Sequence, residues 1–407
     1  MEPYLKSVLD EFSNARETFI RTLTNRFNTY GYQKITTPVF ENYHLYTSVQ
    51  GTIPLDEMVK VISPDGKVLV LRPDVTIPIT QLASLQHHEQ TTEARYAYIL
   101  DVFRNSFHSN DGYVKTQAGV EFLGSARPEA DFEVISLAIN GLLDLEFTSF
   151  KIEIGHAGVM KEMLKILSLS NEQEDQFKQY ITSKNFTSLE EFLFQLDIDP
   201  SVKQSLLTLP LLYGRPDDVL EKALSLSLTT QMTRELERLQ EVYELLTLYG
   251  FGDYVVIDLG LINNMGYYSD IIFQGYIENI GKPILLGGRY DYLAEQFANP
   301  VPAIGFAYDV DALLASNPNS PISPQQIYIQ YDQNKAPEAL RLTKRLRDLN
   351  YTTILSNTVK LDSNCYSISI NNTESSISYR GFKRAFTNVD ELQNLLQTMK
   401  EEVPCNP

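Results

Sequence analysis

Apolar residues recur at every third or fourth position in three parts of the chain, and this spacing predicts amphipathic helices. The first part covers residues 12–30 and is expected to end at Gly31, and the second covers 131–144. The third is a longer run over about 157–250. We interpret this run as a helical insertion, because strand-like segments stand on both sides of it.

Alternating apolar positions and β-branched residues predict strands elsewhere in the first three hundred residues. Residues 57–76 predict a β-hairpin with its turn at Asp65-Gly66. Pro38 interrupts segment 32–41, which we expect to be an edge or interface strand. The remaining strand predictions cover 95–104, 113–124, 254–259, 267–277 and 283–287, and an apolar strand with a following helix is predicted at 302–314.

A segment rich in proline and small polar residues, 316–326, is typical of an exposed linker between domains. It divides the chain into a core of residues 1–315 and a C-terminal domain of residues 327–407. In the C-terminal domain, strands and two helices alternate, and one of the strands is predicted at 377–386. We therefore expect an α+β core with a helical insertion, followed by a small α/β domain.

The composition narrows the possible functions. Among 407 residues, 34 Lys and Arg oppose 52 Asp and Glu, and the formal net charge is −18. Such a charge argues against non-specific nucleic-acid binding, although specific binding through a local basic groove stays open. Cys365 and Cys405 are too few for a disulfide framework or a zinc site. We expect a cytoplasmic protein without a membrane span, a bound metal or a cofactor.

Four polar clusters stand at predicted strand ends or turns, and they cover residues 71–76, 103–121, 259–270 and 285–293. They contain two carboxylates, an amide, an arginine and a pair of tyrosines. Together these groups could form a polar pocket for a small zwitterion. The candidates are Asp74, Arg104, Gln117, Glu121, Tyr267 and Tyr268.

Five of the six candidates also have a purely structural interpretation. Asp74 could cap a turn after a strand, as aspartate often does. Gln117 and Glu121 are four residues apart in a predicted strand, so they share a face that is either solvated or part of a pocket wall. Tyr267 and Tyr268 would point to opposite faces of a strand, which favours core packing for at least one of them.

Taken in order, the clusters resemble the core of class II aminoacyl-tRNA synthetases, and specifically the histidyl branch. GYQKITTPVFE resembles motif 1, which forms the dimer interface, and FRNSFHSNDGYVKTQAGVE resembles motif 2. LRPDVT resembles the loop whose acidic residue meets the histidine amino group, while LGLINNMGYYSD and LLGGRYDYL resemble the two histidine-recognition segments. The resemblance implies an antiparallel sheet flanked by helices, with residues 327–407 as a degenerate anticodon-binding domain. It implies a histidine pocket formed by Asp74, Thr76, Arg104, Gln117, Glu121, Tyr267 and Tyr268.

The chain departs from the synthetases at positions that serve the reaction with ATP. A working histidyl-tRNA synthetase has an arginine where this chain has Asn263, and another where it has Ala312. The segment after Arg104 lacks the glutamate and arginine of motif 2, and Gly266 replaces an aspartate. Loss of a single preorganised donor costs on the order of 10²–10³ in rate. The resemblance therefore implies a histidine-sized pocket without catalytic activity.

A retained pocket without catalytic cations resembles the ATP phosphoribosyltransferase regulatory subunit family. That resemblance implies a non-catalytic partner of a short catalytic subunit, needed for its activity and for histidine feedback in the first step of histidine biosynthesis. It also implies dimers within a hetero-octamer, histidine as an effector and no role for tRNA. Two alternatives stay open, namely a divergent but active histidine-tRNA ligase and a stand-alone histidine sensor with another partner.

Overall fold

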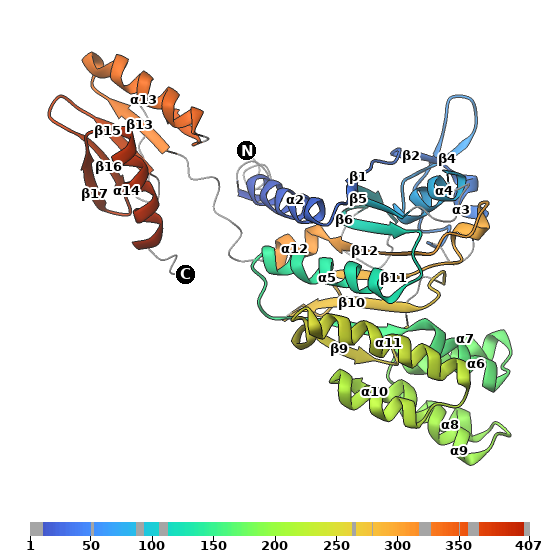
Figure 1. Cartoon of the computed structure of the whole chain (residues 1–407). Helices are drawn as coiled ribbons and strands as arrows, with labels where there is room; N and C mark the ends of the chain where they lie inside the picture. The colour runs from blue at the N-terminus through green and yellow to red at the C-terminus, as the bar shows by residue number, and fades with distance from the viewer. Residues whose placement is uncertain are drawn as a thin grey trace. The chain divides into compact units, whose positions relative to one another are not determined.

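The computed structural model of the chain (Figure 1) describes residues 11–49, 53–86, 93–105, 113–262, 266–278, 280–316, 327–349, 351–356 and 366–402. Asn263, residues 106–112 of the motif 2 loop, residues 317–326 of the expected linker and both cysteines lie outside these ranges. The chain divides into two compact units, Phe19–Pro318 and Asn319–Pro407, and the second is grouped with Met1–Thr18. None of the helices in the described part of the chain combines the length and apolar character that a membrane span requires.

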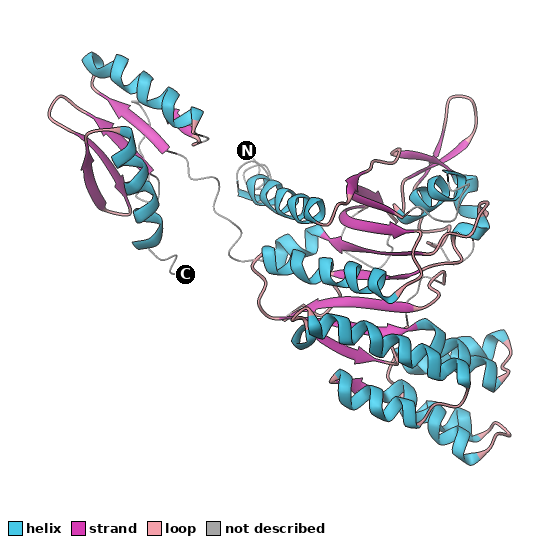
Figure 2. Cartoon of the chain, viewed as in Figure 1, coloured by secondary structure: helices cyan, strands magenta, loops and turns pink. Residues whose placement is uncertain are grey.

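A large, mainly antiparallel sheet forms the centre of the first unit (Figure 2). Its order is β1 (Gln33–Lys34), β5 (Ala94–Phe103), β6 (Val114–Leu123), β12 (Ala303–Asp309), β11 (Leu285–Arg289), β10 (Ile271–Ile277), β7 (Phe150–His156), β9 (Val255–Asp258) and β8 (Tyr213–Gly214). Two pairs, β1 with β5 and β7 with β9, are parallel. β1 lies at an edge of this sheet, as expected for the segment around Pro38, and the chain after that proline enters a different sheet.

Helices cover the large sheet because their apolar faces match its buried residues. Among them are α2 (Glu11–Thr29), α5 (Pro128–Asp144) and α12 (Val310–Ser316). The chain leaves α2 at Gly31, whose φ of +79° suits glycine and confirms the predicted end of this helix. On β12, Phe306 meets Phe27 of α2 edge to face, with ring centroids 6.4 Å apart, and the Tyr308 hydroxyl donates to the carbonyl of Ala138 in α5.

The region from about 157 to 250 is helical, as its periodicity predicts. It contains α6 (Ala157–Leu167), α7 (Asn171–Thr182), α8 (Phe186–Phe194), α9 (Pro200–Thr208), the short 3₁₀ helix η1 (Leu209–Leu211), α10 (Pro216–Ser225) and α11 (Thr230–Leu248). α7 begins with a capping box, in which Ser170 and Gln173 satisfy each other's backbone N–H groups. α11 packs on α5, α6 and α10, and so it joins the insertion to the sheet's own helices.

The predicted hairpin is confirmed as β3 (Lys60–Ile62) and β4 (Val68–Leu71). These two strands form a small sheet with β2 (Phe40–Asn42), and α3 (Tyr43–Thr47) follows β2 in the chain. The hairpin turn contains Gly66 with φ of +82°, a conformation that glycine adopts without strain. Beyond β4 the chain passes Asp74 and enters α4 (Thr76–Gln86). The hairpin therefore delivers the first candidate carboxylate to the site.

Two strand predictions are wrong in detail. β10 begins at Ile271, so Tyr267 and Tyr268 lie in the turn before it. The Asp270 carboxylate accepts the backbone N–H of Ile271 at 2.7 Å, a local bond that fixes this strand start despite the β propensity of the preceding aromatic residues. Segment 377–386 is a hairpin, because Arg380 and Gly381 have φ of 46° and 85°, the signs that a two-residue turn requires.

The C-terminal unit is an α/β structure, as expected. Its sheet has the order β14 (Thr353–Leu355), β13 (Ile327–Tyr331), β15 (Tyr366–Ile370), β16 (Ser375–Tyr379) and β17 (Phe382–Phe386). Its helices are α13 (Ala336–Asp348) and α14 (Val389–Glu402). Buried Ile329, Ile368 and Leu346 belong to a core of its own.

Candidate functional site

The structure brings all seven sequence-predicted site residues to one cavity of about 280 Å³, which we call the polar cavity. Asp74 and Thr76 arrive from the segment after β4, Arg104 from the end of β5, and two further candidates from β6. The turn before β10 adds the tyrosine pair. The two residues from β6 are Gln117 and Glu121, and the two from this turn are Tyr267 and Tyr268.

Strand register explains why the polar cavity exists. Glu121 on β6 stands opposite Gly305 on β12, and a side chain at Gly305 would overlap the Glu121 carboxylate. Tyr98 on β5 stands opposite Gly119, and a Cβ there would collide with the tyrosine ring. Two glycines thus leave room for a carboxylate and a phenol on the same face. Gln117 and Glu121 form part of a pocket wall, which resolves the choice that their spacing left open.

Glu121 is the most deeply buried candidate, with 1% of its surface exposed. Its Oε1 accepts a hydrogen bond from Thr76 Oγ1 at 2.6 Å, and its other oxygen accepts one from the Tyr290 hydroxyl. Burial raises the pKa of Glu121 to about 8, although both hydroxyl donors lower it. Burial therefore favours a protonated Glu121 at neutral pH, whereas a cationic or N–H-bearing ligand would favour its ionised form.

Asp74 both caps a helix and lines the polar cavity, so the capping interpretation holds without excluding a role in the site. Its Oδ1 accepts the backbone N–H of Ile77 at 2.8 Å, in the first turn of α4. Burial raises the pKa of Asp74, while the Arg104 charge and the backbone N–H groups of Ile77 and Thr76 lower it. Its position is therefore fixed before any ligand arrives.

Arg104 supplies an available donor to the polar cavity. Its Nε donates to the Pro73 carbonyl at 2.8 Å, which aims the guanidinium group. Its Nη2 is buried and has no hydrogen-bond partner among the described residues. Buried donors are normally satisfied, because an unsatisfied one carries its full desolvation cost. This nitrogen therefore suits a ligand carboxylate.

Aromatic rings form the remaining wall. The ring centroids of Tyr267 and Tyr268 are 4.8 Å apart, and those of Tyr267 and Tyr290 are 5.9 Å apart with the rings edge to face. Tyr267 also belongs to a buried apolar cluster, as the core-packing interpretation predicts. Sequence reasoning missed Tyr98 and Tyr290 as cavity residues. Tyr290 stands within one of the polar clusters noted in the sequence, whereas Tyr98 becomes significant only through its pairing with Gly119.

At the position where a synthetase would have its second arginine, Ala312 lies in α12 and is 8% exposed. Its backbone N–H donates to Asp309 Oδ1 at 2.9 Å, and its methyl side chain has no charge to offer a phosphate. Lys115, which lines the polar cavity, lies 3.4 Å from the other Asp309 oxygen. At Ala312 the structure thus provides no phosphate-binding cation.

A second cluster has the residue types of a metal site, but its histidine nitrogen carries a proton where a metal would bind. His156, Glu235 and Asp270 place one ligand atom each within 4.8 Å of one another. His156 Nε2 lies 2.7 Å from Asp270, whereas Nδ1 accepts the Gly158 N–H at 3.1 Å. A neutral imidazole with that acceptor carries its proton on Nε2, so the lone pair that a metal would need is absent there. Burial raises the pKa of Asp270, but the hydrogen bond from His156 and the charges of Arg289 and Arg238 act in the opposite direction and lower it.

Comparison with known proteins gives the class first. The family model for histidyl-tRNA synthetase matches residues 4–313. A solved histidyl-tRNA synthetase from Nostoc shares the fold with a TM-score of 0.78 at 17% identity, covering 95% of each chain. The sheet, its helices and the polar cavity therefore define a class II, histidyl-tRNA synthetase-like protein.

Closer relatives define the family. A protein of Oceanobacillus iheyensis named ATP phosphoribosyltransferase regulatory subunit is 44% identical over 88% of this chain and 91% of its own. A same-named protein of Alkaliphilus metalliredigens is 35% identical over 70% and 72%. A structure from Bacillus halodurans, described as an ATP phosphoribosyltransferase regulatory subunit/histidyl-tRNA synthetase, has a TM-score of 0.77 at 29% identity and covers 89% of this chain and 95% of its own. The chain belongs to the family of ATP phosphoribosyltransferase regulatory subunits.

Proposed function

We propose that this chain is the non-catalytic regulatory subunit of an ATP phosphoribosyltransferase, required by a short catalytic subunit and responsible for histidine feedback in the first step of histidine biosynthesis. The single observation that carries the proposal is the 44% identity to a relative of that name over most of both chains. The uncharged Ala312 supports a silent subunit, because charge on a reacting phosphate needs preorganised cations.

The polar cavity is the proposed histidine site. Arg104 Nη2 is a donor for the ligand carboxylate, and Asp74 is an acceptor for its ammonium group. Glu121 and the tyrosine pair would hold the imidazole, whose N–H matches an ionised carboxylate. All these groups are positioned by hydrogen bonds or packing before the ligand arrives, which lowers the cost of binding.

The proposal is tested by co-expressing the chain with the short catalytic subunit from the same genome. Phosphoribosyl transfer to ATP is then assayed with and without this chain, and with added histidine. We expect a stable complex whose activity needs this chain and falls when histidine is added. Mass measurement of the complex tests the expected arrangement of dimers in a cytoplasmic hetero-octamer. A catalytic subunit that is equally active alone would contradict the proposal.

A divergent histidine-tRNA ligase is the second candidate, favoured by the retained amino-acid side of the polar cavity. A ligase must stabilise charge on the α-phosphate, and the alanine at position 312 argues against that. The test is direct. If the purified chain attaches histidine to tRNA and forms no complex with the phosphoribosyltransferase, the ligase interpretation replaces ours.

A further inference from the structure

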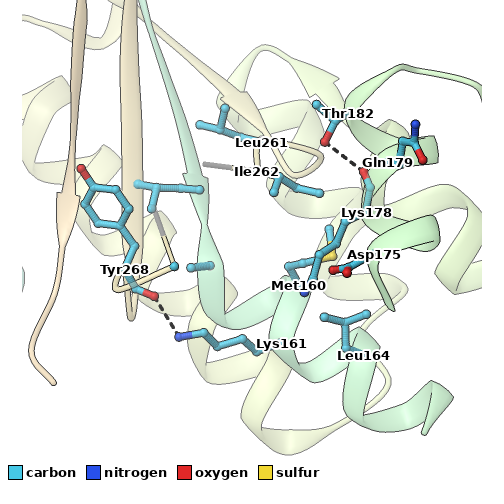
Figure 3. Close-up of a pocket in the computed structure, with 13 residues that line it drawn as sticks. Met160, Lys161, Leu164, Asp175, Lys178, Gln179, Thr182, Leu261, Ile262 and Tyr268 are labelled. Carbon is cyan, nitrogen blue, oxygen red and sulfur yellow. Dashed lines mark hydrogen bonds between the residues drawn. The ribbon is translucent and has the colours of Figure 1, made fainter. Parts of the chain in front are cut away.

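A second cavity of about 560 Å³, the insertion cavity, lies between α6, α7 and the turn that carries Tyr268 (Figure 3). Its volume is within the range of small-molecule sites, roughly 300–1,000 Å³. Tyr268 lines both this cavity and the polar cavity. The insertion cavity is independent of the function proposed above, since none of the other histidine-site residues lines it.

Part of the insertion cavity is apolar. Met160 and Leu164 of α6 are 7% and 9% exposed, and Ile272 of β10 is 2% exposed. Leu261 and Ile262 extend this apolar lining from the segment that follows β9. A hydrocarbon or aromatic group placed here would leave water without losing any hydrogen bond.

The rest of the lining carries charges of both signs. Lys161 donates to the Tyr268 carbonyl at 2.9 Å, and its ammonium group has two further N–H donors. On α7, the exposed Asp175 lines the same cavity, and Lys178 lies 3.4 Å from Glu174. In Figure 3, Lys161 lies beside Tyr268, while Asp175 and Lys178 come from the neighbouring helix.

The cavity combines an apolar surface with an ammonium group and a carboxylate. It therefore complements a molecule that has an apolar part, a carboxylate and an ammonium group. A purely anionic ligand would meet the carboxylate of Asp175. A purely cationic ligand would meet Lys161 and Lys178. We infer that the insertion cavity binds an apolar α-amino acid, with its carboxylate on Lys161, its ammonium on Asp175 and its side chain on the apolar lining.

The experiment is calorimetric titration of the full chain with L-phenylalanine and with two analogues that each lack one charge, phenethylamine and 3-phenylpropanoate. We expect one saturable site for L-phenylalanine, and about tenfold weaker binding of each analogue, as expected for loss of a charge-assisted hydrogen bond. Equal binding of all three compounds would overturn the inference. Absence of saturable binding would also overturn it.

Two variants locate the site. Lys161→Met removes the ammonium group and should weaken L-phenylalanine binding about tenfold. Lys165→Met is the matched control, because Lys165 is on the same helix and pairs with Glu162 without lining the cavity. Ala157→Phe, at the first position of α6, should fill the cavity and abolish binding. Thermal unfolding verifies that each variant is folded, and unchanged affinity in both Lys161→Met and Ala157→Phe would contradict this location.

Discussion

The two cavities share Tyr268 but are built in opposite ways. In the polar cavity, Glu121 and Asp74 are 1% and 5% exposed, and hydrogen bonds fix them in place. In the insertion cavity, apolar side chains are buried, whereas Asp175 and Lys161 are exposed. Burying a charged group costs free energy that a ligand can recover, while exposed charges are screened by water. Changes in the polar cavity should therefore have the larger effects.

The largest effect is expected for Arg104→Met. The variant removes the only buried donor without a partner that the described residues offer to the polar cavity. It also removes the charge that lowers the pKa of Asp74, so the ammonium partner is weakened together with the carboxylate partner. Loss of a charged hydrogen bond costs about 1.5–3 kcal/mol, and we expect histidine affinity to fall roughly a hundredfold or more.

Calorimetric titration with histidine measures this effect. Arg127→Met is a suitable control, because the Arg127 side chain is 69% exposed and its guanidinium group forms a long surface ion pair with Glu93 at 3.5 Å. If Arg104→Met and Arg127→Met bind histidine within threefold of each other, Arg104 does not hold the ligand.

A smaller loss is expected for Glu121→Gln, about ten- to a hundredfold in histidine affinity. Thermal unfolding of the empty protein should change little at pH 7, because Glu121 with a pKa raised by burial to about 8 is already mainly protonated there and glutamine resembles that form. Equal histidine affinity of the variant and the parent chain would remove Glu121 from the site. A large drop in unfolding temperature would indicate a structural role instead.

The same residue makes the polar cavity sensitive to pH. Folding raises the pKa of Glu121 from 4.5 to about 8 by burial, so the folded state binds more protons between these values. Its contribution to stability is complete below the unfolded pKa and is lost as the pH rises through the folded pKa. When the ligand histidine pairs with the ionised form of Glu121, the Glu121 carboxyl group should release up to one proton at pH 7. Calorimetry in buffers of different ionisation enthalpy measures this release, which Glu121→Gln should abolish.

The polar cavity was largely predictable from the sequence, and the insertion cavity was not. Candidate residues of the polar cavity fall in four short motifs at strand ends, where register brings them together. Lys161, Asp175 and Leu164 of the insertion cavity occupy ordinary positions in amphipathic helices, and their spacing is typical of any helix packed on a core. The arrangement of α6, α7 and the turn before β10 around one cavity depends on tertiary packing, which periodicity does not encode. The start of β10 was placed four residues too early for a different reason, because the Asp270 carboxylate binds the N–H of Ile271 locally and ends the preceding turn there.

The smallest effect should come from the bond that links the two cavities. Lys161 Nζ donates to the Tyr268 carbonyl, so Lys161→Met frees one side of the turn whose tyrosine lines the polar cavity. An exposed bond of this kind contributes about 0.5–1 kcal/mol, and we expect histidine affinity to fall only two- to fivefold. Lys165→Met, one turn further along α6, should leave it unchanged. A larger loss, comparable with that of Glu121→Gln, would mean that the turn is held mainly from the insertion side. The cavities would then behave as one site. A ligand that fixes Lys161 would change the affinity for histidine by the same factor by which histidine changes the affinity for that ligand.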